Sequence, residues 1–280
     1  MAIWDNHKKY KDFKCKICND KFFSFYGVFN NFTGIKCDNC GTVQVKENIS
    51  LVEIEEFYSN NYYDDYYNGL GYIETYNQHL KNSFIQKIKI INNLVKSKNI
   101  SILEVGGGLG YFSKTLIDNN YKNVELWEIN DDSIFQAKKL GIDAKKINIF
   151  DTTIENKFDI VVSWATIEHV DNPKLFINKL MKLVKKNGYL LVDTGIIDTY
   201  RDNYSEGISG WFYPPEHLYC FSKKSLLMLV DDCQEKRVMI NADKKKIYIL
   251  KLNFKFFIKK LLFRKIRNGC FDIGMLICKK

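Results

Sequence analysis

Several features that mark common protein classes are missing from this sequence of 280 residues. There is no apolar run of about eighteen residues, the length that a membrane-spanning helix needs. The N-terminal residues Met1 to Lys9 contain no apolar stretch of the kind that directs secretion, so we expect a cytoplasmic protein. The motifs GxSxG, HExxH and the Walker loop are also absent, which removes the mechanisms that depend on them.

The chain has little excess charge outside its C-terminal end. The formal net charge is +9, but residues 241–280 alone carry twelve Lys or Arg against Asp243 and Asp272, which leaves −1 for the rest. A basic end segment is weaker support for nucleic-acid binding than a basic domain. Hydrophobic residues make up 46% and charged residues 27% of the chain, so it can bury a proper core.

Four of the eight cysteines form two CxxC pairs, and the other four have no such spacing. Cys15 and Cys18 are separated by eighteen residues from Cys37 and Cys40. A redox pair or free buried thiols would also be compatible with cysteine pairs, but this spacing favours four thiolates around a zinc ion. Four thiolates leave no open position, so the zinc would be structural. We therefore expect a zinc ribbon over residues 1–50.

Residues 51–84 form a tyrosine-rich connector that includes Tyr62 and Tyr67. Tyrosine rings suit a surface that is half buried against a flat polar group, such as an adenosyl group or a sugar. The alternative is a linker whose rings pack on the next domain. The first interpretation makes Tyr62 and Tyr67 candidate cofactor-binding residues.

A strand, a glycine turn and a helix follow one another at 100–117, which is the context that gives a glycine motif its meaning. Gly106, Gly108 and Gly110 permit a tight turn and the close approach of a ligand. A second strand ends in Glu128, eighteen residues after Gly110, where an acid can accept hydrogen bonds from both ribose hydroxyls. A dinucleotide and S-adenosylmethionine are both compatible with this pattern.

The run from Glu104 to Gly110 resembles the ExGxGxG motif of class I S-adenosylmethionine-dependent methyltransferases. The resemblance covers about residues 85–240, and it implies a Rossmann-like α/β domain over 85–280 with a seven-stranded mixed sheet. Its last strand, near 271–278, would be antiparallel at the sheet edge, after a basic insertion at about 241–268. The resemblance assigns Glu104 to the methionine end of the cofactor. The other candidate cofactor-binding residues are Asn148, Ile149 and Ser163.

On the acceptor side, the stretch from Pro214 to Ser222 resembles the PxHxxxFS segment of a methyltransferase subgroup that often modifies sugars and glycan precursors, sometimes with an N-terminal zinc ribbon. It implies a small polar acceptor, a sugar, nucleotide-sugar or phosphorylated precursor. The sugar C-methyltransferases also have a long C-terminal domain, whereas only about forty residues follow residue 240 here, so we expect methylation on oxygen or nitrogen. His217 is the first candidate for a general base, because imidazole has a suitable pKa, and a structural histidine is the alternative. His169 and Glu168 form the second pair.

Two other functions stay open from the sequence. The zinc ribbon and the basic segment could hold the backbone of an RNA that is methylated, although the confinement of the charge to the end of the chain favours a small acceptor. The chain could also be a binding module that has lost catalysis. The intact glycines and Glu128 argue against this last function.

Overall fold

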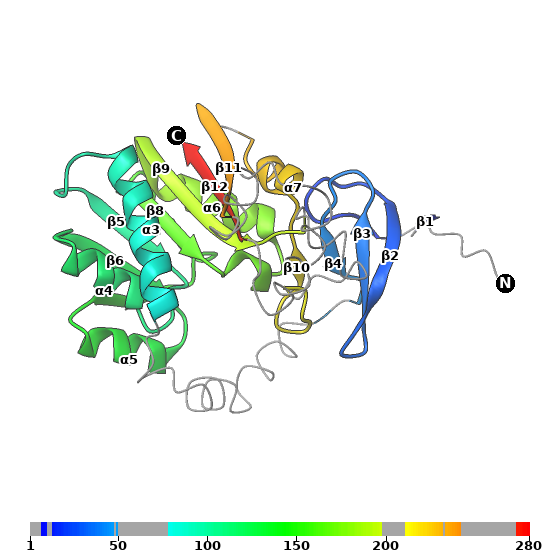
Figure 1. The fold of residues 1–280 in the computed structure, drawn as a ribbon, viewed down its shortest axis with the longest axis horizontal. Helices are drawn as coiled ribbons and strands as arrows, with labels where there is room; N and C mark the ends of the chain where they lie inside the picture. The colour runs from blue at the N-terminus through cyan, green and yellow to red at the C-terminus, as the bar shows by residue number, and fades with distance from the viewer. Residues whose placement is uncertain are drawn as a thin grey trace, which may run out of the picture.

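The computed structural model describes residues 7–9, 13–47, 49, 78–197, 211–231, 233–241 and 273–280. These residues form two sheets that lie side by side, a large mixed sheet and a smaller one built mainly from the N-terminal residues (Figure 1). The tyrosine-rich connector with Tyr62 and Tyr67, and the basic insertion, lie outside the described residues.

The large sheet has seven strands in the order β11-β12-β9-β8-β5-β6-β7. They are β5 (Ser101–Val105), β6 (Asn123–Glu128), β7 (Asp143–Lys146), β8 (Phe158–Trp164), β9 (Val184–Gly195), β11 (Glu235–Asn241) and β12 (Ile273–Lys279). The strands from β7 to β9 pair in parallel, whereas β12 is antiparallel to both of its neighbours. This confirms the Rossmann-like α/β fold with an antiparallel last strand.

Two details of the large sheet differ from expectation. The last strand, β12, is not the edge strand, because β11 pairs along its outer side. The sequence Lys186-Asn187-Gly188 predicts a turn ahead of a strand at 189–193, but these residues lie within β9, where Asn187 has a φ of 65°. The sheet register shifts between Phe158 and Ile160 on the neighbouring strand. A single residue with positive φ and a register shift accommodate the turn without ending the strand.

Helices cover both faces of the large sheet. α3 (Gln78–Leu94), α4 (Tyr111–Asp118) and α5 (Asp131–Lys139) pack on one face, and α6 (Pro173–Leu183) and α7 (Lys223–Met228) on the other. Strands buried on both faces explain the nearly continuous apolar runs in the sequence, such as that of β8. Within the described ranges, no helix is both long enough and apolar enough to cross a bilayer.

The small sheet is antiparallel and takes its last strand from a distant part of the chain. Four strands come from the N-terminal region: β1 (His7–Lys9), β2 (Phe22–Phe29), β3 (Phe32–Cys37) and β4 (Val43–Val45). The fifth, β10 (Tyr219–Cys220), pairs with β4, with Tyr219 opposite Gln44. Its neighbour Phe221 also forms a parallel bridge to Ile196, just beyond β9. The segment that carries His217 therefore connects the two sheets.

Candidate functional site

The glycine loop lies between β5 and α4 and depends on backbone conformations that glycine adopts easily. Gly106, Gly108 and Gly110 have φ values of 69°, 52° and 78°. A Cβ on Gly106 would lie 2.6 Å from the Thr166 methyl, and one on Gly110 would lie 2.6 Å from Cδ1 of Ile142. These glycines keep a tight turn that side chains would block, and the loop leads directly into the first turn of α4.

Glu128, at the end of β6, faces this loop as the sequence predicted. Its Oε2 accepts a hydrogen bond from the Gly108 amide at 2.9 Å, and its Oε1 accepts from the amides of Ile129 at 2.7 Å and Asn130 at 3.2 Å. The side chain is buried to 8% relative exposure. The carboxylate is therefore held in one orientation beside the loop, where adenosine hydroxyls can reach it.

Glu104 lies beneath the glycine loop and is fully buried. Its Oε2 accepts hydrogen bonds from the Ser113 hydroxyl at 2.5 Å and from the Ser113 amide at 3.0 Å, which ties the end of β5 to α4. A Cβ on Gly107 would lie 2.5 Å from the Glu104 carboxyl carbon, so this glycine leaves room for the acid. Burial raises the pKa of Glu104 to about 7, opposed by the Ser113 bonds and by the charge of Lys87.

That lysine belongs to a buried ion pair which the sequence reasoning missed. Lys87 of α3 lies 2.7 Å from Asp193 of β9, with only 10% and 3% of the two side chains exposed, and 4.2 Å from the Trp164 ring centre. Asp193 also accepts a hydrogen bond from the Ala165 amide at 3.1 Å. The sequence did carry a signal, because Lys87 falls on the apolar face of α3 that Phe84, Ile88 and Ile91 define.

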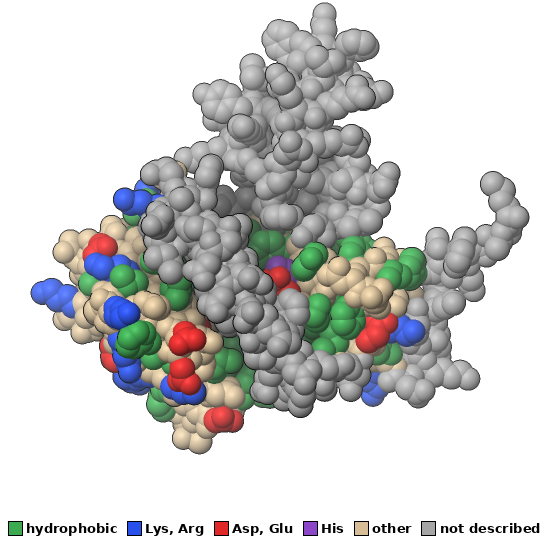
Figure 2. All heavy atoms as spheres, turned by 90° about the horizontal axis from the view of Figure 1, so that it is seen from below, with side chains coloured by type: hydrophobic (Ala, Val, Ile, Leu, Met, Phe, Trp, Pro, Cys, Tyr) green, Lys and Arg blue, Asp and Glu red, His purple; other side chains and the backbone are tan. Residues whose placement is uncertain are grey.

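The three candidate catalytic residues come together at the end of β8. Thr166 contacts the glycine loop, donating to the Gly106 carbonyl oxygen at 3.3 Å, and the short helix η1 (Ile167–His169) follows it. Ligand atoms of Glu168, His169 and His217 all lie within 4.8 Å of one another, a spacing that is also compatible with a bound metal ion. Figure 2 shows histidine and acidic side chains at the surface between the two halves of the molecule.

Backbone carbonyl groups orient both histidine rings. Nδ1 of His217 lies 2.5 Å from the Trp211 carbonyl oxygen, and Nδ1 of His169 lies 2.8 Å from the Glu216 carbonyl oxygen. Because a carbonyl oxygen only accepts, each Nδ1 carries the proton, and in the neutral ring of His217 this leaves the lone pair on Nε2. Nε2 of His217 lies 3.8 Å from the Glu216 carboxylate. The two rings meet edge to face, with centres 4.8 Å apart.

Burial sets the protonation of this cluster. It lowers the pKa of His217, and together with the charge of His217 it lowers the pKa of His169 to about 4. Burial also raises the pKa of Glu168 to about 8, against the opposing effect of the polar side-chain groups of Thr194 and Trp211. Near pH 7 the two imidazoles are therefore neutral and can accept a proton.

Three other predicted cofactor-binding residues have different surroundings. The Ser163 hydroxyl is fully buried and donates to the Val105 carbonyl oxygen at 2.9 Å, so it supports the start of the glycine loop from within the sheet. Ile149 is buried in the core at 5% exposure. Asn148 is exposed, and its side chain accepts a hydrogen bond from the Phe150 amide at 3.0 Å. The roles of these residues toward a cofactor stay predictions.

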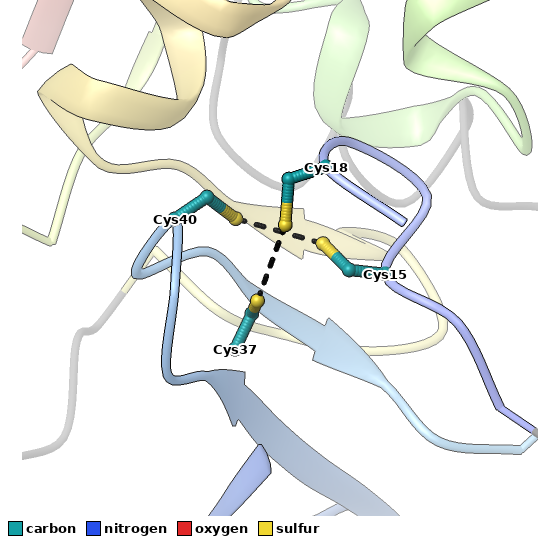
Figure 3. Close-up of side chains that lie close together, drawn as sticks. All are labelled: Cys15, Cys18, Cys37 and Cys40. Carbon is teal, nitrogen blue, oxygen red and sulfur yellow. Dashed lines mark hydrogen bonds between the residues drawn. The ribbon is translucent and has the colours of Figure 1, made fainter. Parts of the chain in front are cut away.

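The four N-terminal cysteines converge on one point (Figure 3). Sγ of Cys15 lies 3.5 Å from that of Cys40, Sγ of Cys18 lies 3.5 Å from that of Cys37, and all four lie within 4.8 Å of one another. A tetrahedral zinc site with bonds of about 2.3 Å places its sulfur atoms about 3.8 Å apart, so the donor set fits zinc in both chemistry and spacing.

The large sheet, the glycine loop and the carboxylate facing it define a protein of Rossmann-like fold, the class in which such a loop and acid hold nucleotide cofactors. A family model described as a methyltransferase domain matches residues 76–233. Since the match covers more than half of the chain, the chain belongs to this family of methyltransferase domains. The cysteine cluster lies before the matched region.

Curated relatives match part of the chain. A mitochondrial ubiquinone biosynthesis O-methyltransferase from Dictyostelium discoideum is 34% identical over 39% of this chain and 41% of its own length. A ubiquinone biosynthesis O-methyltransferase from Pelagibacter ubique is 31% identical over 42% of this chain and 51% of its own length. The chain thus spans about half the length of these relatives.

A solved structure of similar fold is a SAM-dependent methyltransferase from Archaeoglobus fulgidus, with a TM-score of 0.51 and 14% identity. The alignment covers 71% of this chain and 94% of that one. At this level of identity the likeness concerns the fold alone.

Proposed function

We propose that this protein transfers a methyl group from S-adenosylmethionine to a hydroxyl oxygen of a small acceptor. The observation that carries the proposal is the shared sheet edge, where Glu128 faces the glycine loop and Thr166 joins that loop to the Glu168, His169 and His217 cluster. The membership in the methyltransferase domain family and the O-methyltransferase names of the relatives support the same reaction.

On the cofactor side, Glu128 binds the ribose hydroxyls, the backbone of Gly106, Gly108 and Gly110 follows the cofactor closely, and Glu104 acts at the methionine end. The fixed carboxylate of Glu128 supports this assignment, because its orientation is set before any ligand arrives. When bound, the cofactor supplies an electrophilic methyl group on a sulfonium, whose carbon–sulfur electron pair returns to sulfur as the acceptor oxygen bonds to the methyl carbon.

On the acceptor side, His217 accepts the hydroxyl proton at Nε2. The Trp211 carbonyl oxygen keeps the proton of the neutral ring on Nδ1, which leaves Nε2 as the basic atom. The His169 ring of η1 contacts the His217 ring edge to face, and the neighbouring Glu168 is fully buried. Because the sulfonium is already a strong electrophile, alignment contributes much of the rate, and the histidine assists it.

The acceptor class is inferred from the demand that each kind of hydroxyl makes on a histidine base. A phenolic hydroxyl, with a pKa of about 10, gives up its proton more readily than a sugar hydroxyl. A phenol is therefore the favoured acceptor, and the lowered pKa of His217 acts in the same direction. The sugar or glycan precursor expected from the PxHxxxFS resemblance has no support among these relatives, since the two described above are named as O-methyltransferases of ubiquinone biosynthesis.

The proposal is tested by binding and then by methyl uptake. Calorimetry should show one S-adenosylhomocysteine site per chain. Radiolabelled S-adenosylmethionine is then incubated with 3,4-dihydroxybenzoate as the phenolic probe and UDP-glucose as the sugar probe. Label in the phenol supports the proposal, label in the sugar alone would restore the sugar acceptor, and absence of S-adenosylhomocysteine binding would overturn the cofactor assignment.

The base is tested with His217→Asn, which keeps a polar side chain of similar size. Loss of a general base lowers turnover by about 100-fold or more. We expect this loss in turnover with the probe that accepts methyl, while the affinity for S-adenosylhomocysteine changes less than twofold. Normal turnover would show that His217 only shapes the loop.

The second part of the proposal is a structural zinc ion held by Cys15, Cys18, Cys37 and Cys40. The convergence of the four sulfur atoms supports it, as does the fact that three of these residues are almost fully buried. Elemental analysis of the purified protein should give one zinc per chain. The variant Cys37→Ser should lose it, whereas the buried Cys278→Ser should retain it. Equal zinc in both variants would remove the assignment.

A further inference from the structure

We propose that the cysteine module, defined as residues 13–47, positions His217, so that its metal controls the acceptor side of the reaction and leaves the cofactor side unchanged. This inference rests on the proposed function. It concerns the acceptor segment, residues 211–224, which runs between the module and the methyltransferase domain (Figure 1).

Strand pairing attaches the acceptor segment to the module directly after His217. The Val45 amide of β4 donates to the Leu218 carbonyl oxygen at 3.1 Å, and β10 then continues the pairing, with Cys220 opposite Val43. The module sheet therefore ends on a strand that begins two residues after the candidate base. A shift of β4 would move the backbone on which His217 is mounted.

The turn that carries the second cysteine pair contacts the end of the same segment. The Ser222 hydroxyl donates to the Cys40 carbonyl oxygen at 2.5 Å, and Nζ of Lys224 lies 2.6 Å from the Asn39 carbonyl oxygen. Gly41, at a φ of 77°, brings this turn so close that an added Cβ would lie 3.3 Å from that of Ser222. A change in the conformation of the turn that carries Cys37 and Cys40 would therefore also move residues 222–224.

The β2–β3 hairpin of the module holds the start of the segment. Phe212 packs edge to face on Phe29, with ring centres 5.1 Å apart, and on Tyr26 at 6.2 Å. Nδ2 of Asn30 donates to the Pro214 carbonyl oxygen at 2.8 Å. The module thus contacts the segment on both sides of His217. The ring of His217 is in turn oriented by the Trp211 carbonyl oxygen.

The module cannot hold this shape by its own core. Cys15, Cys37 and Cys40 are buried in one hydrophobic cluster with Phe212 and Phe221 of the acceptor segment and with the apolar side of α6. Beside α6, a cleft of about 720 Å³ separates the module from the domain, lined by residues that include Phe13, Gln44 and Lys174. In a module this small, metal binding supplies much of the folding free energy.

The cofactor side is held by other contacts. The Gly106 amide donates to the Trp127 carbonyl oxygen at 2.9 Å, and the Gly108 amide donates to Glu128 at the same distance. Glu104 is bonded to Ser113 of α4. All of these groups belong to the large sheet and its helices, so loss of the metal should leave the cofactor site intact.

The test compares two readouts in the full chain with and without metal. Hydrogen exchange followed by mass spectrometry measures the amides of residues 217–222 and of residues 101–118, and calorimetry measures S-adenosylhomocysteine affinity. After removal of metal with a chelator, we expect exchange in 217–222 to rise at least tenfold. Exchange in 101–118 and the affinity should change less than twofold. The imidazole signal of His217 in 15N-histidine spectra should shift.

Two variants separate positioning from loss of folding. Phe212→Leu keeps all four cysteines and should retain zinc. It weakens the packing of the acceptor segment on the β2–β3 hairpin, so it should raise exchange in 217–222. Phe112→Leu, a buried ring of α4 in the other hydrophobic cluster of the domain, is the matched control and should leave exchange in 217–222 unchanged.

Each outcome decides the inference. Unchanged exchange in 217–222 after metal removal overturns it, and a parallel loss of S-adenosylhomocysteine affinity also overturns it, because the metal would then support the whole fold. Absence of S-adenosylhomocysteine binding in the metal-loaded protein is a failure of the proposed function. In that case the exchange and imidazole measurements still report whether the module positions His217.

Discussion

Glu128 combines two tasks, since it accepts backbone hydrogen bonds from three amides and faces the glycine loop. The variant Glu128→Gln keeps the size of the side chain but replaces one acceptor oxygen with a donor and removes the charge. A hydrogen bond to a charged group contributes about 1.5–3 kcal/mol, so we expect S-adenosylhomocysteine to bind about 10- to 100-fold more weakly. Calorimetry measures this change, and zinc content should not alter.

Glu125 provides the matched control for that experiment. It lies on the same strand but on the opposite face, bonded to Lys145 and Lys157. Glu125→Gln should leave S-adenosylhomocysteine affinity unchanged. Equal weakening by both variants, or none by Glu128→Gln, would remove Glu128 from the ribose-binding role.

Glu104 makes stability depend on pH in a direction that can be worked out. Burial raises its pKa to about 7 from 4.5, so between these values the folded chain binds more protons at this site than the unfolded chain. Its contribution to stability therefore falls as the pH rises from about 4.5 to 7. Glu104→Gln removes this dependence. Between pH 5 and pH 8 the variant should therefore lose less unfolding free energy than the wild type, by about 2–3 kcal/mol.

Denaturant unfolding at the two pH values measures this difference. Glu125 again serves as the control, because its pKa is shifted in the opposite direction. Although burial raises the pKa of Glu125, the bonds from Lys145 and Lys157 outweigh it, and the net pKa is lowered. The contribution of Glu125 to the free energy of unfolding is therefore lost as the pH falls. An identical pH dependence in wild type and Glu104→Gln would contradict the raised pKa of Glu104.

At the scale of elements, the turn from β5 into α4 can be examined with two glycines that have the same φ. Gly110 and Gly141 both have a φ of 78°, but a Cβ on Gly110 would lie 2.6 Å from Ile142, whereas one on Gly141 would meet nothing within 4 Å. Gly141→Ala should lower the free energy of unfolding by about 1 kcal/mol through backbone strain alone. Gly110→Ala should lower it by a further 1–3 kcal/mol, roughly, through overpacking.

Thermal unfolding of the two variants gives the comparison. If they unfold at the same temperature, backbone strain alone accounts for Gly110, and its contact with Ile142 has no energetic weight. Because Gly110 precedes α4 immediately, a larger effect there also shows that the loop and the helix are packed as one unit.

Local pattern was enough to predict the elements of the cofactor side. Apolar strands buried on both faces, three spaced glycines and an acid at a strand end are short-range signals, and the structure places Glu128 beside Gly108 accordingly. The pairing of β10 with β4 joins residues about 175 positions apart, and two residues of strand carry no periodicity. The sequence therefore predicted His217 as a site residue but could not show that the cysteine module holds it.

Lys87 illustrates a different limit. Its position on the apolar face of α3 was visible in the sequence, but the partner Asp193 lies in a strand more than one hundred residues later. A buried lysine needs an acid nearby to keep its charge, and only the fold shows which acid provides it. The Ser163 hydroxyl likewise bonds inside the sheet, to the Val105 carbonyl oxygen, a contact that the local sequence does not reveal, and its role toward a cofactor stays a prediction.

At the scale of the whole molecule, the distribution of charge favours a small acceptor over RNA as the substrate. A protein that neutralises six or more phosphates loses about a thousandfold in affinity between 50 and 200 mM salt. Twelve of the basic residues lie in 241–280, while the remainder of the chain is close to neutral. The site described above is assembled from that remainder, from residues between Lys87 and His217.

We therefore expect methyl transfer to the phenolic probe to vary less than twofold between 50 and 200 mM salt, because a small neutral-to-monoanionic acceptor releases few counterions. Anisotropy with a labelled 20-nucleotide RNA should show only nonspecific binding at physiological salt, with a Kd of about 10 µM or weaker.

A truncation at residue 240 would remove β12 and unfold the sheet, so the informative variant replaces Lys255, Lys259 and Lys260 with Gln. Submicromolar RNA binding that these three changes abolish, together with label transferred into the RNA, would reverse the choice of acceptor.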